Sequence, residues 1–254
     1  MIDLTGKTAF VSGSSRGIGR ACVQRLAEAG ADIIINYVSS RSAAMETARV
    51  VRDLGRQPFV VKADVSEEDD VKAMMEFVTE EVGCLDVLVS NAATGGFRPL
   101  LRSNSRHFAN AMNTNALALV HLVQAAMPLL QRASGRAKVV AISSHGSHMA
   151  LPMYGLIGSS KAALESLARH LTLEVGDLGV NVNVVKAGLV ETDSTRMIPN
   201  SETMFSSRRQ KSMMGDRELE VEDVANVVLF LASDLSDLIQ GETITVDGGS
   251  AIHV

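Results

Sequence analysis

Short apolar runs rich in β-branched residues alternate along the chain with longer segments whose apolar residues recur every three or four positions. The runs predict strands buried on both faces, and the longer segments predict amphipathic helices. This alternation predicts an α/β fold, a Rossmann-type doubly wound parallel sheet with helices on both faces. The predicted strands are 8–12, 33–37, 59–62, 87–90, 139–143, 180–185 and 243–246, and the predicted helices are 18–29, 43–54, 67–82, 105–130, 160–175 and 221–232.

The alternation is interrupted between residues 193 and 216, where Ser, Met and Arg dominate and the periodicity is weak. A long insertion between a strand and the last helix is typical of a segment that closes over a substrate, so we expect a lid there. No internal repeat, low-complexity tract or linker divides the chain, and we therefore expect one domain over residues 1–254.

The composition narrows the class of protein. The 254 residues are 46% hydrophobic and 21% charged, which is typical of a globular chain. Lys and Arg number 24 against 29 Asp and Glu, without a basic block, so we expect no nucleic-acid partner. The apolar runs are too short for a membrane span, and the polar N-terminal segment does not match a secretory signal. Two cysteines far apart are typical of reduced thiols, so we expect a cytoplasmic protein.

A cluster of glycines closes the first predicted strand and opens the first helix. Gly13, Gly17 and Gly19 let the backbone turn sharply and bring its N–H groups against a pyrophosphate at the helix N-terminus. The strand–turn–helix context predicts a dinucleotide-binding loop, and a glycine-rich turn without a ligand is the alternative.

The residues after the second predicted strand bear on the choice of cofactor. NAD-binding sites usually have an acidic residue there, which holds the ribose 2′-hydroxyl. This chain has Asn36, Tyr37 and Ser39 there, followed by Arg41, so nothing repels a 2′-phosphate. Arg16 and Arg41 are placed to bind such a phosphate, and we predict NADPH. A solvated residue at the start of a helix is an equally good interpretation of Arg41.

Polar residues also follow the ends of the later predicted strands. They are Asp64 with Val65, Asn91 with Ala92, Ser144 and, in the helix 105–130, Asn115. Together with the glycine loop and Asp-Gly-Gly at 247–249, they resemble the motifs of the short-chain dehydrogenase/reductase superfamily over nearly the whole chain. The resemblance implies an NAD(P)-binding reductase domain in which Asp64 contacts the adenine and Asn115 supports the active site.

The tyrosine departs from the commonest pattern of this superfamily, in which Tyr stands four residues before Lys. Lys161 matches the lysine, but the residue four before it is Ile157, and Tyr154 stands seven before it. Seven residues of helix return to nearly the same face, so Tyr154 and Lys161 can still converge on one site. Pro152 and Gly155 weaken the prediction of a regular helix at that point.

The spacing between Tyr154 and Lys161 is similar to that of NADPH-dependent enoyl-acyl-carrier-protein reductases of the FabL type. Ala187-Gly188, where most of the superfamily has Pro-Gly, resembles the same enzymes. The resemblance implies reduction of trans-2-enoyl thioesters bound to acyl carrier protein or CoA, in fatty-acid or related acyl-chain synthesis. The alternatives are a 3-ketoacyl reductase or another ketone or alcohol oxidoreductase, and an NADPH-binding sensor without turnover.

The same resemblance implies roles for the candidate catalytic residues. Tyr154 would hydrogen-bond the thioester oxygen as its charge grows, and Lys161 would hold the nicotinamide ribose. Asn115 would orient Lys161 through water. Ser144 would polarise a ketone in most relatives, and here its role stays open between that and lining the pocket.

Further expectations concern the surroundings of the site. Flexible thioethers such as Met153 and Met197 suit an acyl pocket, and ordinary lid packing is the alternative. His145 and His148 are expected to be loop residues at the pocket rim, and no metal site is predicted. The helices 105–130 and 160–175 have more apolar positions than one buried face requires, so we predict a homotetramer.

Basic residues outnumber acidic ones within 193–217. Arg196, Arg208, Arg209, Lys211 and Arg217 stand against three acids. This excess could meet an acidic carrier protein, and a plain solvated surface is the alternative.

The predicted site residues form three groups. The cofactor-binding residues are Gly13, Ser14, Ser15, Arg16, Gly17, Ile18, Gly19, Asn36, Tyr37, Ser39, Arg41, Asp64, Val65, Asn91, Ala92, Lys161, Gly188, Val190 and Thr192. The substrate-contacting residues are Thr94, Ser144, Met153, Tyr154 and Met197, and the catalytic residues are Tyr154, Lys161, Asn115 and Ser144.

Overall fold

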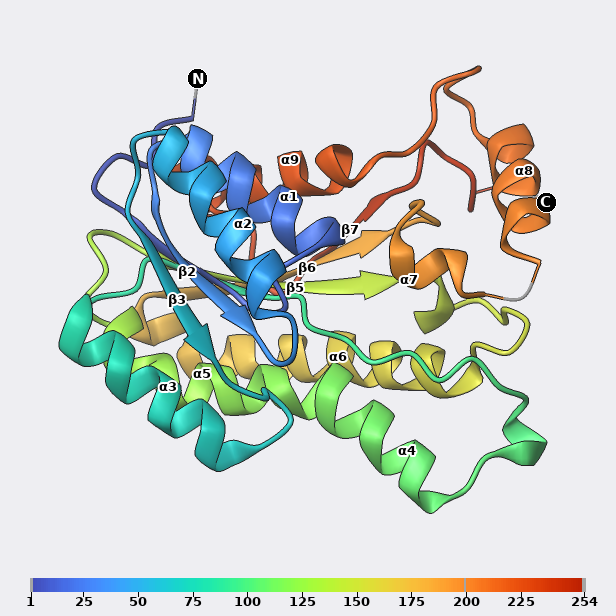
Figure 1. Cartoon of the computed structure of the whole chain (residues 1–254), viewed down its shortest axis with the longest axis horizontal. Helices are drawn as coiled ribbons and strands as arrows, with labels where there is room; N and C mark the ends of the chain where they lie inside the picture. The colour runs from blue at the N-terminus through green and yellow to red at the C-terminus, as the bar shows by residue number, and fades with distance from the viewer. Residues whose placement is uncertain (1, 199, 253–254) are drawn as a thin grey trace.

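The strands form one parallel sheet. The computed structural model describes residues 2–198 and 200–252, and within these the strand order is β3-β2-β1-β4-β5-β6-β7. Helices lie on both faces of the sheet (Figure 1), and the β-branched residues of its central strands are buried. The predicted doubly wound sheet is therefore confirmed. The strands are β1 (Thr8–Val11), β2 (Asp32–Tyr37), β3 (Pro58–Lys62), β4 (Val87–Ser90), β5 (Ala137–Ser144), β6 (Val180–Ala187) and β7 (Thr243–Val246).

Helices cover both faces of the sheet, and each face has its own apolar core (Figure 1). On one face lie α1 (Gly17–Glu28), α2 (Arg41–Asp53) and α9 (Val221–Leu231). On the other lie α3 (Glu68–Glu81), α4 (Ser105–Met112), α5 (Ala118–Leu130) and α6 (Gly155–Val175).

The predicted helix 105–130 is present as one helical run, but it is not a regular α-helix. A π turn, η2 (Asn113–Leu117), separates α4 from α5. Asn115 lies in this turn, and its buried side chain pairs with the backbone of Thr94. One extra residue in the turn lets this tertiary contact form without ending the helix, and such turns are common at functional sites.

Two other boundaries differ from the prediction. α6 begins at Gly155 rather than at 160, so Tyr154 is its N-cap residue. The predicted lid contains two helices, α7 (Asp193–Arg196) and α8 (Ser201–Lys211), of which α8 has no buried side chain. An isolated helix without an apolar face leaves no periodic signal in the sequence.

Cys22 lies buried in α1 and Cys84 is partly buried, and both are free thiols. Burial raises the pKa of the Cys22 thiol to about 12. Within the described residues, no helix combines the length and apolarity needed to cross a membrane.

Candidate active site

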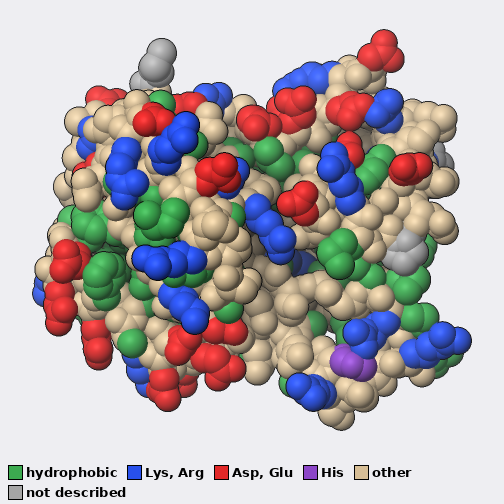
Figure 2. Space-filling view, viewed as in Figure 1, with side chains coloured by type: hydrophobic (Ala, Val, Ile, Leu, Met, Phe, Trp, Pro, Cys, Tyr) green, Lys and Arg blue, Asp and Glu red, His purple; other side chains and the backbone are tan. Residues whose placement is uncertain are grey.

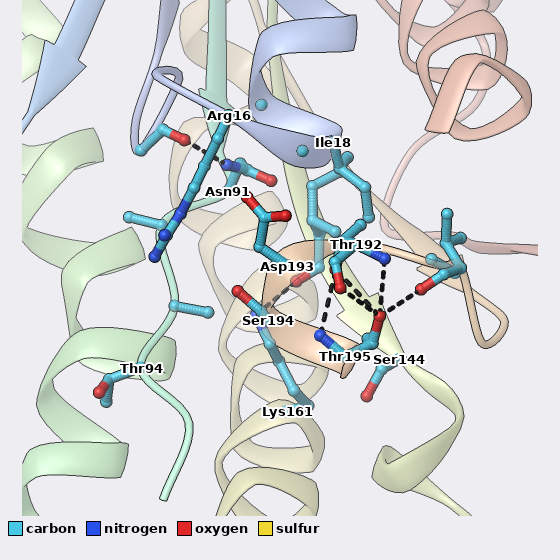
Figure 3. Close-up of a pocket in the computed structure, with 18 of the residues that line it drawn as sticks. Arg16, Ile18, Asn91, Thr94, Ser144, Lys161, Thr192, Asp193, Ser194 and Thr195 are labelled. Carbon is cyan, nitrogen blue, oxygen red and sulfur yellow. Dashed lines mark hydrogen bonds between the residues drawn. The ribbon is translucent and has the colours of Figure 1, made fainter. Parts of the chain in front are cut away.

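A cavity of about 620 Å³ opens at the carboxyl ends of the strands, where β1 and β4 lie side by side. The chain crosses the sheet at this point, because β2 and β3 lie on one side of β1 while β4 to β7 lie on the other. Open parallel sheets bind ligands at such a switch point. Figure 3 shows side chains from the glycine loop, α6 and the segment after β6 around one cavity.

Hydrogen bonds fix the glycine loop to the end of β4. The Ser12 hydroxyl accepts from the backbone N–H groups of Asn91 and Ala92 at 2.9 and 3.0 Å. The Asn91 amide donates to the Ser12 carbonyl at 2.9 Å. Gly13 has φ +61°, and a Cβ there would lie 2.9 Å from the Ala92 Cα. A side chain at Gly13 would therefore collide with Ala92, and only glycine lets the loop pack this closely on the end of β4. The α1 N-terminus that follows the loop suits a pyrophosphate.

Two predicted cofactor residues hold the loop from behind. Asn36 is buried, and its side chain accepts from the Gly13 N–H at 3.1 Å and donates to the Ala63 carbonyl at 3.0 Å. Ser14 is buried as well, and its hydroxyl accepts from the Asn36 N–H. Neither Asn36 nor Ser14 lines the cavity as the structure describes it, and the hydrogen bonds of both side chains are already used to hold the loop. Their direct contact with a cofactor stays a prediction.

The end of β2 is open and without acidic side chains. Tyr37, Ser39 and Ser40 line the cavity beside Arg16, and Arg16 is exposed. Arg41 is exposed at the start of α2 and does not line the cavity as the structure describes it. This favours the alternative interpretation of Arg41 as a solvated residue.

Tyr154 is the residue immediately before α6, and its side chain lines the cavity. Its hydroxyl lies 3.1 Å from the Ser144 hydroxyl, and its ring packs on Gly146, where a Cβ would lie 2.4 Å from the ring. Burial raises the pKa of Tyr154, and the Ser144 hydrogen bond acts in the opposite direction. Ile157, four residues before Lys161, is buried.

Lys161 lies on α6, about two helical turns after Tyr154, and is buried at the cavity wall. Its ammonium donates to the Ile142 carbonyl at 2.6 Å. Burial lowers the pKa of Lys161 to about 8, and the nearby Glu165 carboxylate opposes this effect. Its charge therefore depends on its neighbours more than that of an ordinary lysine.

Asn115 connects the wall of the cavity to α6. Its side chain accepts from the Thr94 N–H at 2.7 Å and donates to the Ser160 hydroxyl at 3.0 Å. Asn115 thus contacts the residue before Lys161, while Thr94 lines the cavity. Its predicted link to Lys161 through water stays a prediction.

A buried ion pair under the site was not predicted from the sequence. The Glu165 carboxylate accepts from the Ser143 hydroxyl at 2.5 Å and lies 3.2 Å from the Lys186 ammonium. The side chains of Lys186 and Glu165 are only 10% and 12% exposed. The available signal was a lysine inside the apolar strand β6 and a glutamate four residues after Lys161.

The prediction of His145 as a rim residue is wrong. His145 is buried, and its Nε2 lies 3.1 Å from an Asp247 oxygen. Burial lowers the pKa of His145, although the Asp247 carboxylate raises it. The C-terminal loop, which supplies Asp247, packs over the residue after Ser144, a tertiary contact without a local sequence signal. His148 is exposed, as expected for the rim.

The two predicted substrate methionines lie outside the cavity. Met153 has φ +59° and its carbonyl accepts from the Arg98 N–H, so it belongs to a turn. Met197 is 77% exposed on the lid. As far as the structure describes the cavity, neither lines it. The apolar wall comes instead from Leu151, Pro152, Ile198 and Met204.

Most of the lid arginines are neutralised within the chain. Arg196 pairs with Glu191 at 2.9 Å, and Arg209 and Arg217 pair with Glu218 and Asp223. Arg208 lines the cavity and donates to the Ser250 carbonyl. The lid is thus a weaker basic surface than its composition implies.

The cavity gathers most of the predicted residues. They are Gly13, Ser15, Arg16, Gly17, Ile18, Gly19, Tyr37, Ser39, Asp64, Val65, Asn91, Ala92, Thr94, Ser144, Tyr154, Lys161, Gly188, Val190 and Thr192. Residues that the sequence analysis missed, such as Thr114, Ile142 and Thr195, are neighbours in sequence of predicted ones.

A glycine loop at the switch point, facing a Ser, a Tyr and a Lys across one cavity, defines an oxidoreductase of the short-chain dehydrogenase/reductase class. Residues 13–251 match the family model described as "Enoyl-(Acyl carrier protein) reductase", and the chain belongs to this family.

Relatives from three bacteria illustrate the range of the family. The chain is 34% identical to 1-cyclohexenylcarbonyl-CoA reductase of Streptomyces collinus, over 97% of this chain and 87% of that one. It is 32% identical to 3-oxoacyl-(acyl-carrier-protein) reductase FabG of Staphylococcus aureus, over 96% and 97%. A short chain dehydrogenase from Burkholderia cenocepacia J2315, solved in complex with NADP, has 31% identity and a TM-score of 0.87, over 97% and 98%. The first two names differ in the bond that is reduced, so relatives alone do not assign the reaction of this chain.

Proposed function

We propose that this chain is an NADPH-dependent enoyl reductase, similar to the FabL type, that reduces the carbon–carbon double bond of trans-2-enoyl thioesters in fatty-acid or related acyl-chain synthesis. The observation that carries the proposal is the position of Tyr154. Tyr154 is the residue before α6, and its hydroxyl lies beside Ser144 in the cavity. A ketone-reducing tyrosine would stand four residues before Lys161, where this chain has the buried Ile157. The Streptomyces collinus relative supports it, since its name specifies a CoA thioester with a double bond next to the carbonyl.

NADPH fits the groups that line the cofactor side. The glycine loop and the α1 N-terminus, which line the cavity, would hold the pyrophosphate. Arg16 and Ser39 would bind the 2′-phosphate, which meets no acid at the end of β2. Lys161 would hold the nicotinamide ribose hydroxyls. Bound NADPH would supply the hydride for the β-carbon of the substrate.

Tyr154 would act on the thioester oxygen. Hydride addition at the β-carbon places negative charge on that oxygen as an enolate, and a proton from solvent added at the α-carbon completes the reduction. Because burial raises the pKa of Tyr154, its phenol stays protonated and donates a hydrogen bond to the growing charge. A charged Lys161 behind it adds electrostatic stabilisation. Ser144, 3.1 Å from the phenol, orients the hydroxyl.

Reduction of 3-oxoacyl thioesters is the second candidate. The hydrogen bond between Ser144 and Tyr154 favours it, because the same two hydroxyls would polarise a ketone oxygen. The Staphylococcus aureus relative is named for this reaction. NADPH oxidation with crotonyl and acetoacetyl thioesters in parallel separates the two candidates.

The decisive variant is Tyr154→Phe, which removes the hydroxyl and keeps the ring. We expect kcat with crotonyl thioester to fall by about 10²–10³, the size of effect when one oxyanion donor is removed, with NADPH affinity unchanged. Tyr37→Phe is the matched control, since Tyr37 lies at the β2 end of the cavity. Near wild-type turnover of Tyr154→Phe would remove the main chemical support for the proposal.

A further inference from the structure

A basic and apolar surface flanks the mouth of the cavity on the side of α4. Its members are Arg98, Leu100, Leu101, Arg102 and Arg106, which we call the arginine–leucine patch. Leu100 and Leu101 lie in the short helix η1 (Leu100–Arg102), where they are 58% and 101% exposed. Figure 2 shows this region at the lower right, where Lys or Arg, one His and hydrophobic side chains gather without Asp or Glu among them.

No acidic residue lies near the patch in the sequence. Between Asp86 and Glu165 the sequence contains no Asp or Glu. The ion pairs among the described residues leave out Arg98, Arg102 and Arg106. Arg98 is half-buried and its guanidinium contacts the His107 ring at 2.6 and 2.9 Å, whereas Arg102 and Arg106 are exposed. This contrasts with the lid, whose arginines largely pair with acids of the same chain.

The patch is joined rigidly to the site. The Arg98 N–H donates to the Met153 carbonyl at 2.9 Å, one residue before Tyr154. Leu100 packs on Gly155, where a Cβ would lie 2.6 Å from its Cγ. The Phe97 ring lies 6.0 Å from the Tyr154 ring. A partner bound to the patch is therefore adjacent to the entrance through which a substrate reaches Tyr154.

We propose that the arginine–leucine patch is the docking surface for an acidic acyl carrier protein that presents the enoyl thioester on its flexible arm. The proposal rests on the thioester reduction proposed above. Charge complementarity argues for this occupant, because uncompensated arginines attract an acidic surface. The exposed leucines favour a protein surface over the phosphates of CoA, which would need only the arginines. The family description, which names the carrier protein, is consistent with such a partner.

The test combines binding with turnover. Affinity for crotonyl-loaded acyl carrier protein is measured by fluorescence anisotropy, and kcat/KM is measured with crotonyl thioesters of carrier protein, CoA and pantetheine. Arg102→Glu/Arg106→Glu is expected to weaken carrier binding, and kcat/KM with it, by about tenfold or more. Turnover of crotonyl-pantetheine, which lacks the carrier, should stay unchanged. Leu101→Ser should weaken carrier binding without affecting the fold, because its side chain is fully exposed.

Arg49→Glu/Arg52→Glu is the matched control, because it makes the same charge change on α2, on the opposite face of the sheet. Equal loss in this control, or unchanged carrier affinity in the patch variant, would overturn the proposal. A larger loss of kcat/KM with crotonyl-CoA than with the carrier substrate in the patch variant would also overturn it and would assign the patch to CoA. A change in the assembly mass of the patch variant by light scattering would overturn it as well and would assign the patch to a second copy of this chain. Fluorescence anisotropy measures binding of the carrier protein and therefore tests the docking surface even if the enzyme shows no turnover. If the wild type does not turn over crotonyl-pantetheine, that result contradicts only the proposed function.

Discussion

The charge of Lys161 depends on a carboxylate one helical turn away, and this dependence can be measured. Residues at i and i+4 have Cβ atoms about 5–6 Å apart. Two unit charges about 6 Å apart at an effective dielectric constant of about 20 attract by about 3 kcal/mol, or about 2 pH units, and this is an upper bound here because Lys186 neutralises part of the Glu165 charge. Glu165→Gln removes this attraction, so we expect the pKa of Lys161 to fall below about 8 by roughly 1–2 pH units.

The sign of the effect follows from the charge. Lys161 loses its proton as the pH rises through its pKa, so the alkaline limb of kcat should move to lower pH in Glu165→Gln. Tyr154 does not set this limb, because burial raises the pKa of its phenol. The neighbouring His145 and His148 do not either, because burial lowers the pKa of both and leaves them neutral at alkaline pH. The assay is kcat for crotonyl thioester between about pH 6 and pH 10, the range between the usual pKa values of His and Lys.

The control separates charge from packing. Glu165→Gln leaves Lys186 buried without its partner, which costs about 3–5 kcal/mol of stability in typical buried pairs. Glu165→Leu/Lys186→Met removes both charges and keeps similar volumes, so the field at Lys161 changes less and the alkaline limb should lie closer to the wild type. An unchanged limb in folded Glu165→Gln would refute the reasoning.

Two further predictions concern the cofactor and the assembly. Arg16→Ala should raise KM for NADPH about tenfold or more and leave KM for NADH nearly unchanged, since a charge-assisted contact is worth about 1.5–3 kcal/mol; equal effects on both cofactors in steady-state kinetics would contradict the 2′-phosphate role. Leu173, 82% exposed on α6, should lie in a subunit interface, so Leu173→Glu should reduce a homotetramer to smaller species in light scattering, and a monomeric wild type would disprove the assembly.

The sheet was predictable because its signal is local. Strands such as β2, with Ile33, Ile34 and Ile35, are buried on both faces, so the apolar run itself carries the information. The glycine loop was predictable for a similar reason, because Gly13 serves a backbone conformation that few other residues adopt.

The parts that were missed depend on contacts between distant segments. Asn36 has the residue type and position of a ligand-binding group, and only the fold shows that its amide is used by Gly13 and Ala63. Glu165 and Lys186 are far apart in the sequence, and only the packing of α6 against β6 brings their charges together.

The π turn η2 has a consequence for how the length of this chain can change. A π turn is an α-helix with one inserted residue, so removing one residue between 113 and 117 would restore a regular helix and keep α4 and α5 in register. Elsewhere in the same helix a deletion would rotate every following apolar residue by about 100° out of the core. The extra residue therefore serves the amide of Asn115 and its contacts with Thr94 and Ser160, not the packing of α5. A lineage released from the need for that amide could lose the residue without losing the fold.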